Sequence, residues 1–352
     1  MICFIATCIL GIAAFLAAAH QQPTQLTFFA IGDWGRQGAY NQTEVASLMA
    51  RVASRRHPSF IISTGDNVYP NGLNASSDPL FTHSFTDVYH QSSLQVPWHA
   101  VLGNHDYGDG FEYCENDATT PCARGPSYQL GTALSKRDWR WHCERSYSLR
   151  YLNGLVEFFF IDTSPFIAGL LNQSWAQYSG GLLQQDWEVQ LKEFEQRLAR
   201  SPAQWKVVVG HHPPRSNGHH GNNTELIVHV EPLLVKYNVR AYIAGHDHSL
   251  EHISPVDLAS GGMGGEVPQY FVSGGGSQCD REFVGTVDSQ YQYSWSGFMS
   301  GTVTEDSFDI EFYTLKGGSG SGDDVEAAYT FRMLSGVGGG GRGVSTATTH
   351  DG

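Results

Sequence analysis

Five short polar motifs, each directly after a run of apolar residues, constrain the fold of this chain more than any other feature. Each apolar run is predicted to be a strand, and the ends of such strands meet at one edge of an alternating α/β sheet. The motifs are Gly32-Asp33-Trp34-Gly35, Gly65-Asp66-Asn67-Val68-Tyr69, Gly103-Asn104-His105-Asp106, Gly210-His211-His212-Pro213 and Gly245-His246-Asp247-His248. Together they supply enough oxygen and nitrogen ligands for two adjacent metal ions, which is the equipment for metal-assisted hydrolysis of phosphate esters.

Strand-like and helix-like segments alternate along the chain, which predicts a layered α/β domain. Strands are expected at Leu26–Ile31, Ser59–Ser63, His99–Leu102, Ser146–Tyr151, Leu155–Ile161, Trp205–Val209, Arg240–Ala244, Tyr270–Ser273, Gly297–Val303 and Phe308–Leu315. Helices are expected at Thr43–Arg56, Asp186–Arg200 and Leu226–Tyr237. Ala327–Leu334 is a candidate for one more strand.

The two ends of the chain differ in composition from the middle. Met1–Ala19 is almost wholly apolar and ends in three alanines, which predicts a signal peptide cleaved near Ala19 or His20. An uncleaved membrane anchor is the alternative. The core of one domain is expected over residues 24–316, and the Gly/Ser-rich residues 317–352 are expected to be a disordered tail. After cleavage we expect no membrane span, and a protein that is secreted or resides in the lumen of the secretory or lysosomal pathway.

Charge and cysteine content narrow the class of protein further. The formal net charge of −14 argues against nucleic acid as the partner, whereas a small anionic substrate is compatible with bound metal ions. The mature chain keeps Cys114, Cys122, Cys143 and Cys279, which predicts two disulfides with Cys114–Cys122 as the nearest pairing, although three pairings exist. Asn-x-Ser/Thr sequons begin at Asn41, Asn74, Asn172 and Asn222 and predict a glycoprotein.

The side chains in the motifs suit two kinds of ion. Asp33 and Asp66 offer carboxylates, Asn104 offers an amide oxygen, and a phenolate from Tyr69 would fit Fe(III). The imidazoles of His211, His246 and His248 suit zinc, iron, copper or nickel. A mixed set of this kind with one shared carboxylate describes a binuclear centre. The glycines beside the motifs would allow close approach of the backbone to the metals.

The order and wording of the motifs resemble those of the calcineurin-like metallophosphoesterases. Within them, Trp34 and Tyr69 make the chain similar to the purple (tartrate-resistant-type) acid phosphatases of the low-molecular-weight class. Tyr69-Pro70 stands where protein Ser/Thr phosphatases have Asp-Arg-Gly, and Val272–Gly276 resembles a further family element. The resemblance extends from Leu26 to Leu315 and implies a four-layer α/β/β/α sandwich, in which two mixed sheets pack face to face between helices.

The resemblance also implies a role for each residue of the site. Asp66 would bridge the two ions, His105 would contact the substrate phosphate, and Asp106 would orient His105 through a hydrogen bond. The ferric ion would be bound by Asp33, Tyr69 and His248, and a divalent ion (Fe, Zn or Mn) by Asn104, His211 and His246.

Two positions depart from the pattern of this family or leave a choice open. The fourth motif reads Gly-His-His-Pro in place of Gly-His-Tyr-Pro, so His212 either binds or packs. The family has a histidine nine residues after the fourth-motif ligand, which acts on the leaving group. That spacing selects His220, with His219 beside it as the alternative.

The expected function is therefore a secreted acid phosphatase, monomeric, that hydrolyses small phosphate monoesters by attack of a metal-bound hydroxide at an Fe(III)–M(II) centre. His105 would stabilise the developing charge and His220 would protonate the leaving alcohol. One alternative is a phosphodiesterase or nucleotidase on the same scaffold with other metals. Another is a non-enzymatic iron-binding or adhesive glycoprotein.

Overall fold

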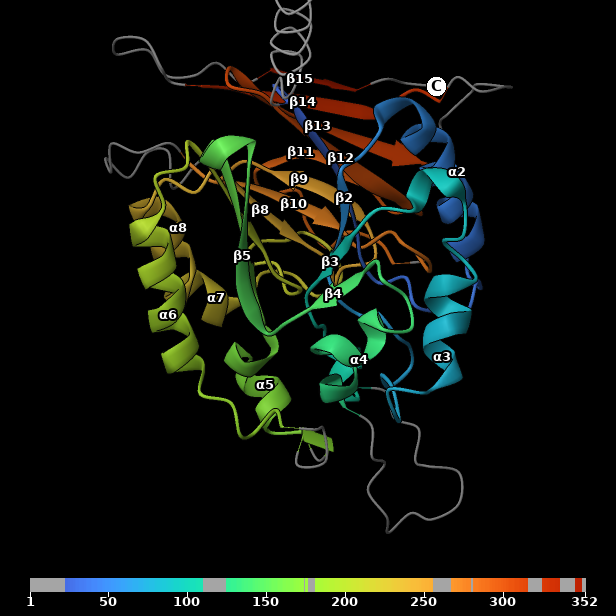
Figure 1. The fold of residues 1–352 in the computed structure, drawn as a ribbon. Helices are drawn as coiled ribbons and strands as arrows, with labels where there is room; N and C mark the ends of the chain where they lie inside the picture. Colours follow the sequence, from blue (N-terminus) through green and yellow to red (C-terminus); the bar gives the residue numbers. More distant parts are fainter. Residues whose placement is uncertain are drawn as a thin grey trace, which may run out of the picture.

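Two mixed β-sheets lie face to face between two groups of helices (Figure 1). The computed structural model describes residues 23–109, 125–173, 175–176, 181–255, 267–279, 281–315, 325–335 and 346–349. Met1–Ala19, with its predicted signal peptide, and Cys114 and Cys122 lie outside the described residues. Within them, no helix is long and apolar enough to cross a membrane.

The first sheet contains eight strands in the order β15-β14-β13-β12-β1-β2-β3-β4. Strands β1 to β4 are parallel, and the remaining neighbours pair antiparallel. The strands are β1 (Leu26–Ile31), β2 (Phe60–Ser63), β3 (Trp98–Ala100), β4 (Trp141–Cys143), β12 (Gly297–Val303), β13 (Ser307–Thr314), β14 (Tyr329–Leu334) and β15 (Thr346–Thr349).

The second sheet contains seven strands in the order β11-β9-β10-β8-β7-β6-β5. Its centre, from β10 to β6, is parallel, and antiparallel strands close both edges. The strands are β5 (Ser146–Tyr151), β6 (Val156–Ile161), β7 (Trp205–Val209), β8 (Ala241–Ala244), β9 (Leu250–Ile253), β10 (Gln269–Ser273) and β11 (Ser289–Tyr293).

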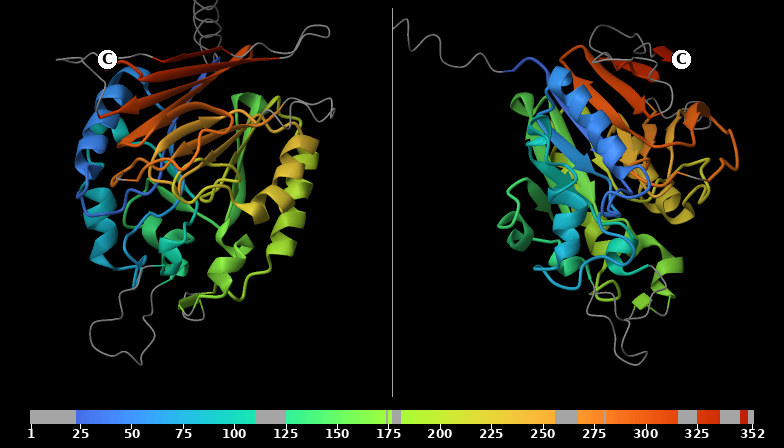
Figure 2. Two further views of the ribbon diagram at one scale, coloured as in Figure 1. Left: turned by 180° about the vertical axis from the view of Figure 1, so that it is seen from behind. Right: turned by 90° about the vertical axis from the view of Figure 1, so that its right-hand side faces the viewer.

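Helices cover the outer faces of both sheets. Figure 1 shows α2 and α3 on one side of the molecule and α6, α7 and α8 on the other, and Figure 2 shows the same arrangement from behind and from the side. The helices are α2 (Gln42–Arg56), α3 (Pro79–Phe81), α4 (Thr132–Ser135), α5 (Ala168–Leu171), α6 (Trp187–Arg200), α7 (Thr224–His229) and α8 (Glu231–Lys236). Short 3-10 or π turns occur at Thr82–Thr86, Ser92–Leu94, His105–Tyr107, Pro126–Tyr128, Leu152–Gly154 and Ser164–Phe166.

Alternation along the strands creates three apolar layers. Phe28 and Phe29 are neighbours on β1, yet Phe28 packs between the two sheets while Phe29 packs toward α2, because successive side chains of a strand point to opposite faces. Phe159 on β6 and Phe194 on α6 belong to a third layer, between the second sheet and its helices. The predicted four-layer α/β/β/α sandwich is confirmed.

Three expectations from the sequence need correction. The helix expected over Leu226–Tyr237 is in fact two helices, α7 and α8, that meet at Val230. Pro232, in the first turn of α8, has no N–H to donate to a carbonyl of the preceding turn, so a single continuous helix is disfavoured there. The tail expected to be disordered contributes β14, which matches the candidate strand at Ala327–Leu334, and β15, and both extend the first sheet. Cys143 and Cys279 are buried, but no disulfide joins them.

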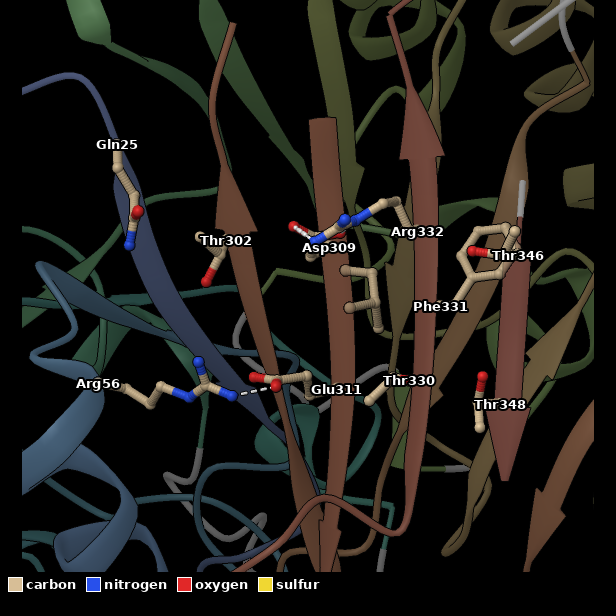
Figure 3. A pocket seen from close by; sticks show the side chains of 11 residues that line it. Gln25, Arg56, Thr302, Asp309, Glu311, Thr330, Phe331, Arg332, Thr346 and Thr348 are labelled. Atoms are coloured by element: carbon tan, nitrogen blue, oxygen red, sulfur yellow. Dashed lines mark hydrogen bonds and ion pairs between the residues drawn. The ribbon is translucent and has the colours of Figure 1, made fainter. Parts of the chain in front are cut away.

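A cavity of about 420 Å³ lies beside the polar outer face of β13, β14 and β15 (Figure 3). Gln25 in its wall precedes β1, whereas the first polar motif follows β1, so cavity and motifs lie at opposite ends of that strand. The charged groups of the cavity neutralise one another in two ion pairs, Arg56–Glu311 and Arg332–Asp309.

Candidate metal centre

The seven predicted ligands all follow the carboxyl ends of central parallel strands. The first sheet supplies four of them and the second sheet supplies three, so the site spans the junction between the two sheets. They are Asp33 after β1, Asp66 and Tyr69 after β2, Asn104 after β3, His211 after β7, and His246 and His248 after β8. Residues separated by more than 200 positions thus meet at one edge, as the alternating pattern predicts.

The hydroxyl of Tyr69 marks one half of the site. It lies 2.9 Å from Oδ2 of Asp66, 3.2 Å from Oδ1 of Asp33 and 3.0 Å from Nε2 of His248. Nε2 of His248 is also 3.5 Å from Oδ1 of Asp33. These four side chains are the ones that the resemblance assigns to the ferric ion and its bridge.

The amide oxygen of Asn104 marks the other half. It lies 2.9 Å from Nε2 of His211 and 3.1 Å from Nδ1 of His246. Oδ2 of Asp66, which faces Tyr69, is also 3.5 Å from Nε2 of His211. Asp66 therefore contacts both halves, as a bridging ligand must.

The contacts of His211 show that this half suits a cation. Nδ1 lies 2.9 Å from the carbonyl oxygen of Thr64, which can only accept, so Nδ1 donates this hydrogen bond. The other ring nitrogen, Nε2, faces the oxygens of Asn104 and Asp66, which are also electron donors. Ligand atoms about 2.1 Å from one metal lie about 3.0–3.4 Å apart, close to these spacings. The residues fit the metal pair of the family.

Backbone conformation points to the same edge. Asp33, Asp66 and His246 have φ angles of 61°, 51° and 70°, in the left-handed region that costs a residue with a side chain about 1–3 kcal/mol. Such conformations persist where the surrounding structure enforces them, and here each directs a ligand side chain into the site.

Glycines allow the loops to approach the ligands closely. A Cβ on Gly245 would lie 2.5 Å from Oδ2 of Asp33, and one on Gly65 would lie 2.6 Å from Nδ1 of His211. Gly65 also has a φ of 99°. These glycines therefore let the backbone come close to the side chains of the predicted ligands.

Burial sets the charge state of the site in the absence of a cation. It raises the pKa of Asp33 and Tyr69 well above their usual ranges, and Asp66 adds to both effects through like charge. Burial alone would also raise the pKa of Asp66, but His211 and His105 lower it to about 2. Burial and the neighbouring histidines lower the pKa of His246 and keep its ring in the neutral form that binds metals.

His105 lies at the site, but Asp106 does not orient it as expected. Nδ1 of His105 is 2.7 Å from the carbonyl oxygen of Pro70, and its ring lies 4.3 Å from that of Tyr69. The carboxylate of Asp106 instead accepts hydrogen bonds from the backbone of the second and third motifs, because its loop turns it inward. Asp106 is thus a positioning residue for the loops.

The structure brings His220, and not His219, to the metal ligands. The ring centroid of His220 is 4.1 Å from that of His246, whereas the ring contact of His219 is with His220. His212 is buried, with Nδ1 2.8 Å from Oγ1 of Thr163 and its ring 4.4 Å from that of His246. His212 packs against His246, and its Nε2 has no hydrogen-bond partner among the described residues. A ring nitrogen of His212 also lies within 4.8 Å of ring nitrogens of His211 and His246, so the geometry is compatible with binding as well as packing.

Two arginines at the site were not predicted from the sequence. The guanidinium carbon of Arg36 lies 3.6 Å from the ring centroid of Tyr69, and Nη1 of Arg281 donates to Nε2 of His220 at 2.8 Å. Both belong to segments next to recognised motifs, but nothing in the sequence indicates which way their side chains turn.

The fold and the site define a class of protein, the metallophosphoesterases. The family model described as "Calcineurin-like phosphoesterase" matches residues 26–250, which contain all five motifs. Comparison with individual relatives narrows this class: the chain belongs to the purple acid phosphatases, a family of phosphatases.

The family assignment rests on two relatives from Arabidopsis thaliana. Purple acid phosphatase 3 is 40% identical over 83% of this chain and 75% of its own length. Purple acid phosphatase 4 is 36% identical over 91% of this chain and 90% of its own length. Among solved structures, "GAP50 the anchor in the inner membrane complex of Plasmodium" has a TM-score of 0.65 at 22% identity and covers 88% of both chains, so it shows the fold alone.

Proposed function

We propose that this protein is a secreted acid phosphatase that hydrolyses small phosphate monoesters with Fe(III) and a divalent ion, Fe, Zn or Mn. The main support is the position of the Tyr69 hydroxyl, within 3.2 Å of Asp33, Asp66 and His248. A buried tyrosine surrounded by two carboxylates is unfavourable as a bare phenolate, whereas a hard trivalent cation stabilises it.

The metal ligands, His105 and His220 would each have a different role toward a bound phosphate ester. When bound, the metal pair supplies an activated water and neutralises charge on the phosphate oxygens. His105 is partly exposed at the mouth of the site and held by Pro70, so it can donate to a phosphoryl oxygen as charge develops. His220, at the opposite exposed edge, can protonate the departing alcohol.

An acid pH optimum follows from the role of His220. His220 has an exposed edge, but partial desolvation of its ring is the main influence that lowers its pKa below 6.5. The nearby Arg281 adds to this effect, while Asp247 opposes it. Protonated His220 is thus more abundant in acid, where it can act as the donor.

The secretory part of the proposal depends on the predicted signal peptide and the sequons. Asn74, Asn172 and Asn222 are exposed, as a glycan attachment site requires. Asn41 is partly buried and donates to Ser296, so we expect it to be glycosylated least.

The visible spectrum of the purified protein, combined with metal analysis and assays, tests this proposal. We expect a purple or pink band with iron present, loss of that band in Tyr69→Phe, and turnover of 4-nitrophenyl phosphate. A colourless protein with zinc or manganese that prefers bis(4-nitrophenyl) phosphate would favour the phosphodiesterase alternative. Absence of bound metal after reconstitution would favour a non-enzymatic glycoprotein.

A further inference from the structure

We propose that Arg281 selects substrates whose leaving group carries its own negative charge, such as phosphoanhydrides and bisphosphates. This inference rests on the proposed function, because it places Arg281 on the leaving-group side of the same site. It concerns recognition of a second anion, which the metal ligands and His105 do not account for.

The first observation is the position of Arg281. Its Nη1 donates to Nε2 of His220 at 2.8 Å, and the His220 ring lies 4.1 Å from the ring of His246. Arg281 and His220 are both exposed, whereas Asp33, Asp66 and His211 beneath them are buried. Arg281 therefore lies on the solvent side of the ligand His246, next to the group assigned to the leaving oxygen.

The second observation is that, among the residues that the structure describes, Arg281 forms no ion pair with a carboxylate. Six other arginines do form one, namely Arg56, Arg140, Arg145, Arg150, Arg215 and Arg332. The guanidinium of Arg281 instead contacts His220, a residue of the site. In a chain with a net charge of −14, an arginine beside a phosphate site without a carboxylate partner leaves its charge available to a ligand.

Asp247, which lies close to His220, is already engaged in hydrogen bonds within the protein. Asp247 is buried, and its oxygens accept hydrogen bonds from the backbone N–H of His220 at 2.8 Å and from Oγ of Ser216 at 2.5 Å. Asp247 therefore holds the loop that carries His220 in place, while the exposed surface beside His220 presents Arg281.

A guanidinium has five N–H donors, and the structure uses one of them on a neutral acceptor. A phosphate oxygen is a stronger acceptor for a guanidinium than an imidazole nitrogen is, because the bond is charge-assisted on both sides. An anionic leaving group is thus expected to take Arg281 away from His220.

Hydrolysis of such a substrate needs no reactant other than water. With pyrophosphate, water forms the new bond to the attacked phosphorus and the bond from that phosphorus to the bridging oxygen breaks. The bridging oxygen keeps the electron pair and leaves as part of the second orthophosphate, and the proton released by water is shared between the products and the solvent.

Binding to the metal-loaded full-length protein tests the proposal independently of turnover. Calorimetric titration with pyrophosphate and with orthophosphate gives the preference of the wild type for the second phosphate. We expect Arg281→Met to reduce this preference roughly fivefold to tenfold, the range for one partly exposed charge-assisted contact, and Arg281→Lys to keep part of it. Arg332→Met removes the same charge at a distant ion pair and should leave the preference unchanged.

Turnover of ADP and of 4-nitrophenyl phosphate provides the second readout. Arg281→Met should raise KM for ADP and have a smaller effect on 4-nitrophenyl phosphate, whose leaving group has no phosphate. Equal losses on both ligands would show that Arg281 merely positions His220, and an unchanged preference would also overturn the proposal. A wild type that binds both anions but hydrolyses neither ester nor anhydride would refute the proposed function, while the binding ratio still tests Arg281.

Discussion

Replacing Gly245 by alanine tests whether the position of Asp33 controls the metal centre. The added Cβ would lie 2.5 Å from Oδ2 of Asp33 and 2.8 Å from Oγ1 of Thr64. Because a carbon and an oxygen in contact need about 3.3–3.6 Å, the Asp33 carboxylate must move by about 1 Å. The φ of Gly245 is not positive, so the effect comes from this collision and not from backbone strain.

The size of the expected effect follows from that displacement. A shift of about 1 Å at a reacting centre can lower the rate about 100-fold. The same shift disturbs the hydrogen bond from the His246 N–H to Asp33, now 3.0 Å long, and overpacking of this kind costs about 1–3 kcal/mol. We therefore expect Gly245→Ala to have reduced metal content, kcat/KM lowered about 100-fold and a Tm lower by several degrees.

The matched control is Gly169→Ala. Gly169 lies in α5 with nothing within 4 Å of an added Cβ, so alanine should be neutral or slightly stabilising there. Metal content by elemental analysis, kcat/KM on 4-nitrophenyl phosphate and Tm by calorimetry are compared for both variants. Wild-type metal content and kcat/KM in Gly245→Ala would refute the reasoning, even if Tm falls.

Three further predictions concern other parts of the molecule. Asp106→Ala should lower the free energy of unfolding by about 3 kcal/mol or more, because it leaves the N–H groups of Asn67, Val68 and Gly103 without an acceptor. Urea unfolding of the metal-loaded protein measures this free energy. A loss below about 1 kcal/mol would contradict the prediction. His220→Ala should reduce kcat more for alkyl phosphates than for 4-nitrophenyl phosphate, and equal losses would argue against its role as an acid. His252 is buried with a pKa lowered from 6.5 to about 4, so the stability it contributes is complete above pH 6.5 and is lost as pH falls toward 4. His252→Phe should therefore gain about 2 kcal/mol relative to wild type between pH 7 and 4.5 in unfolding experiments. A constant difference would show that the pKa of His252 is the same in the folded and unfolded states, and would contradict the lowered pKa.

Much of the fold could be predicted because the motifs and the strands are local signals. Runs of apolar residues, or apolar residues at alternate positions, are long enough to indicate strands at Trp205–Val209 and Gly297–Val303. Both strands have the expected bounds in the structure. The short strands β4, β9 and β11 were missed, since three to five residues carry too little pattern and their pairing comes from tertiary contacts.

The sequence predicted which residues come together in the site, but it did not predict the backbone and side-chain contacts around them. The order of Asp, Asn and His in the motifs indicated the cluster that the structure shows. The left-handed backbone of Asp33 and His246 could not be read from residue type, since neither is glycine. The inward turn of Asp106 and the arginines beside Tyr69 and His220 depend on side-chain directions that only the packed fold determines.

The division of the ligands between the two sheets has a consequence for the order of events during synthesis. Asp33, Asp66, Tyr69 and Asn104 leave the ribosome more than 100 residues before His211, His246 and His248 do. The early group offers mainly oxygen ligands, and the imidazoles arrive only after β7 and β8 have been made. Until the second sheet docks, the growing chain holds half a site and would bind either ion weakly. Metal loading is therefore expected to follow folding, so that the ions available where folding is completed would decide which metals enter the site.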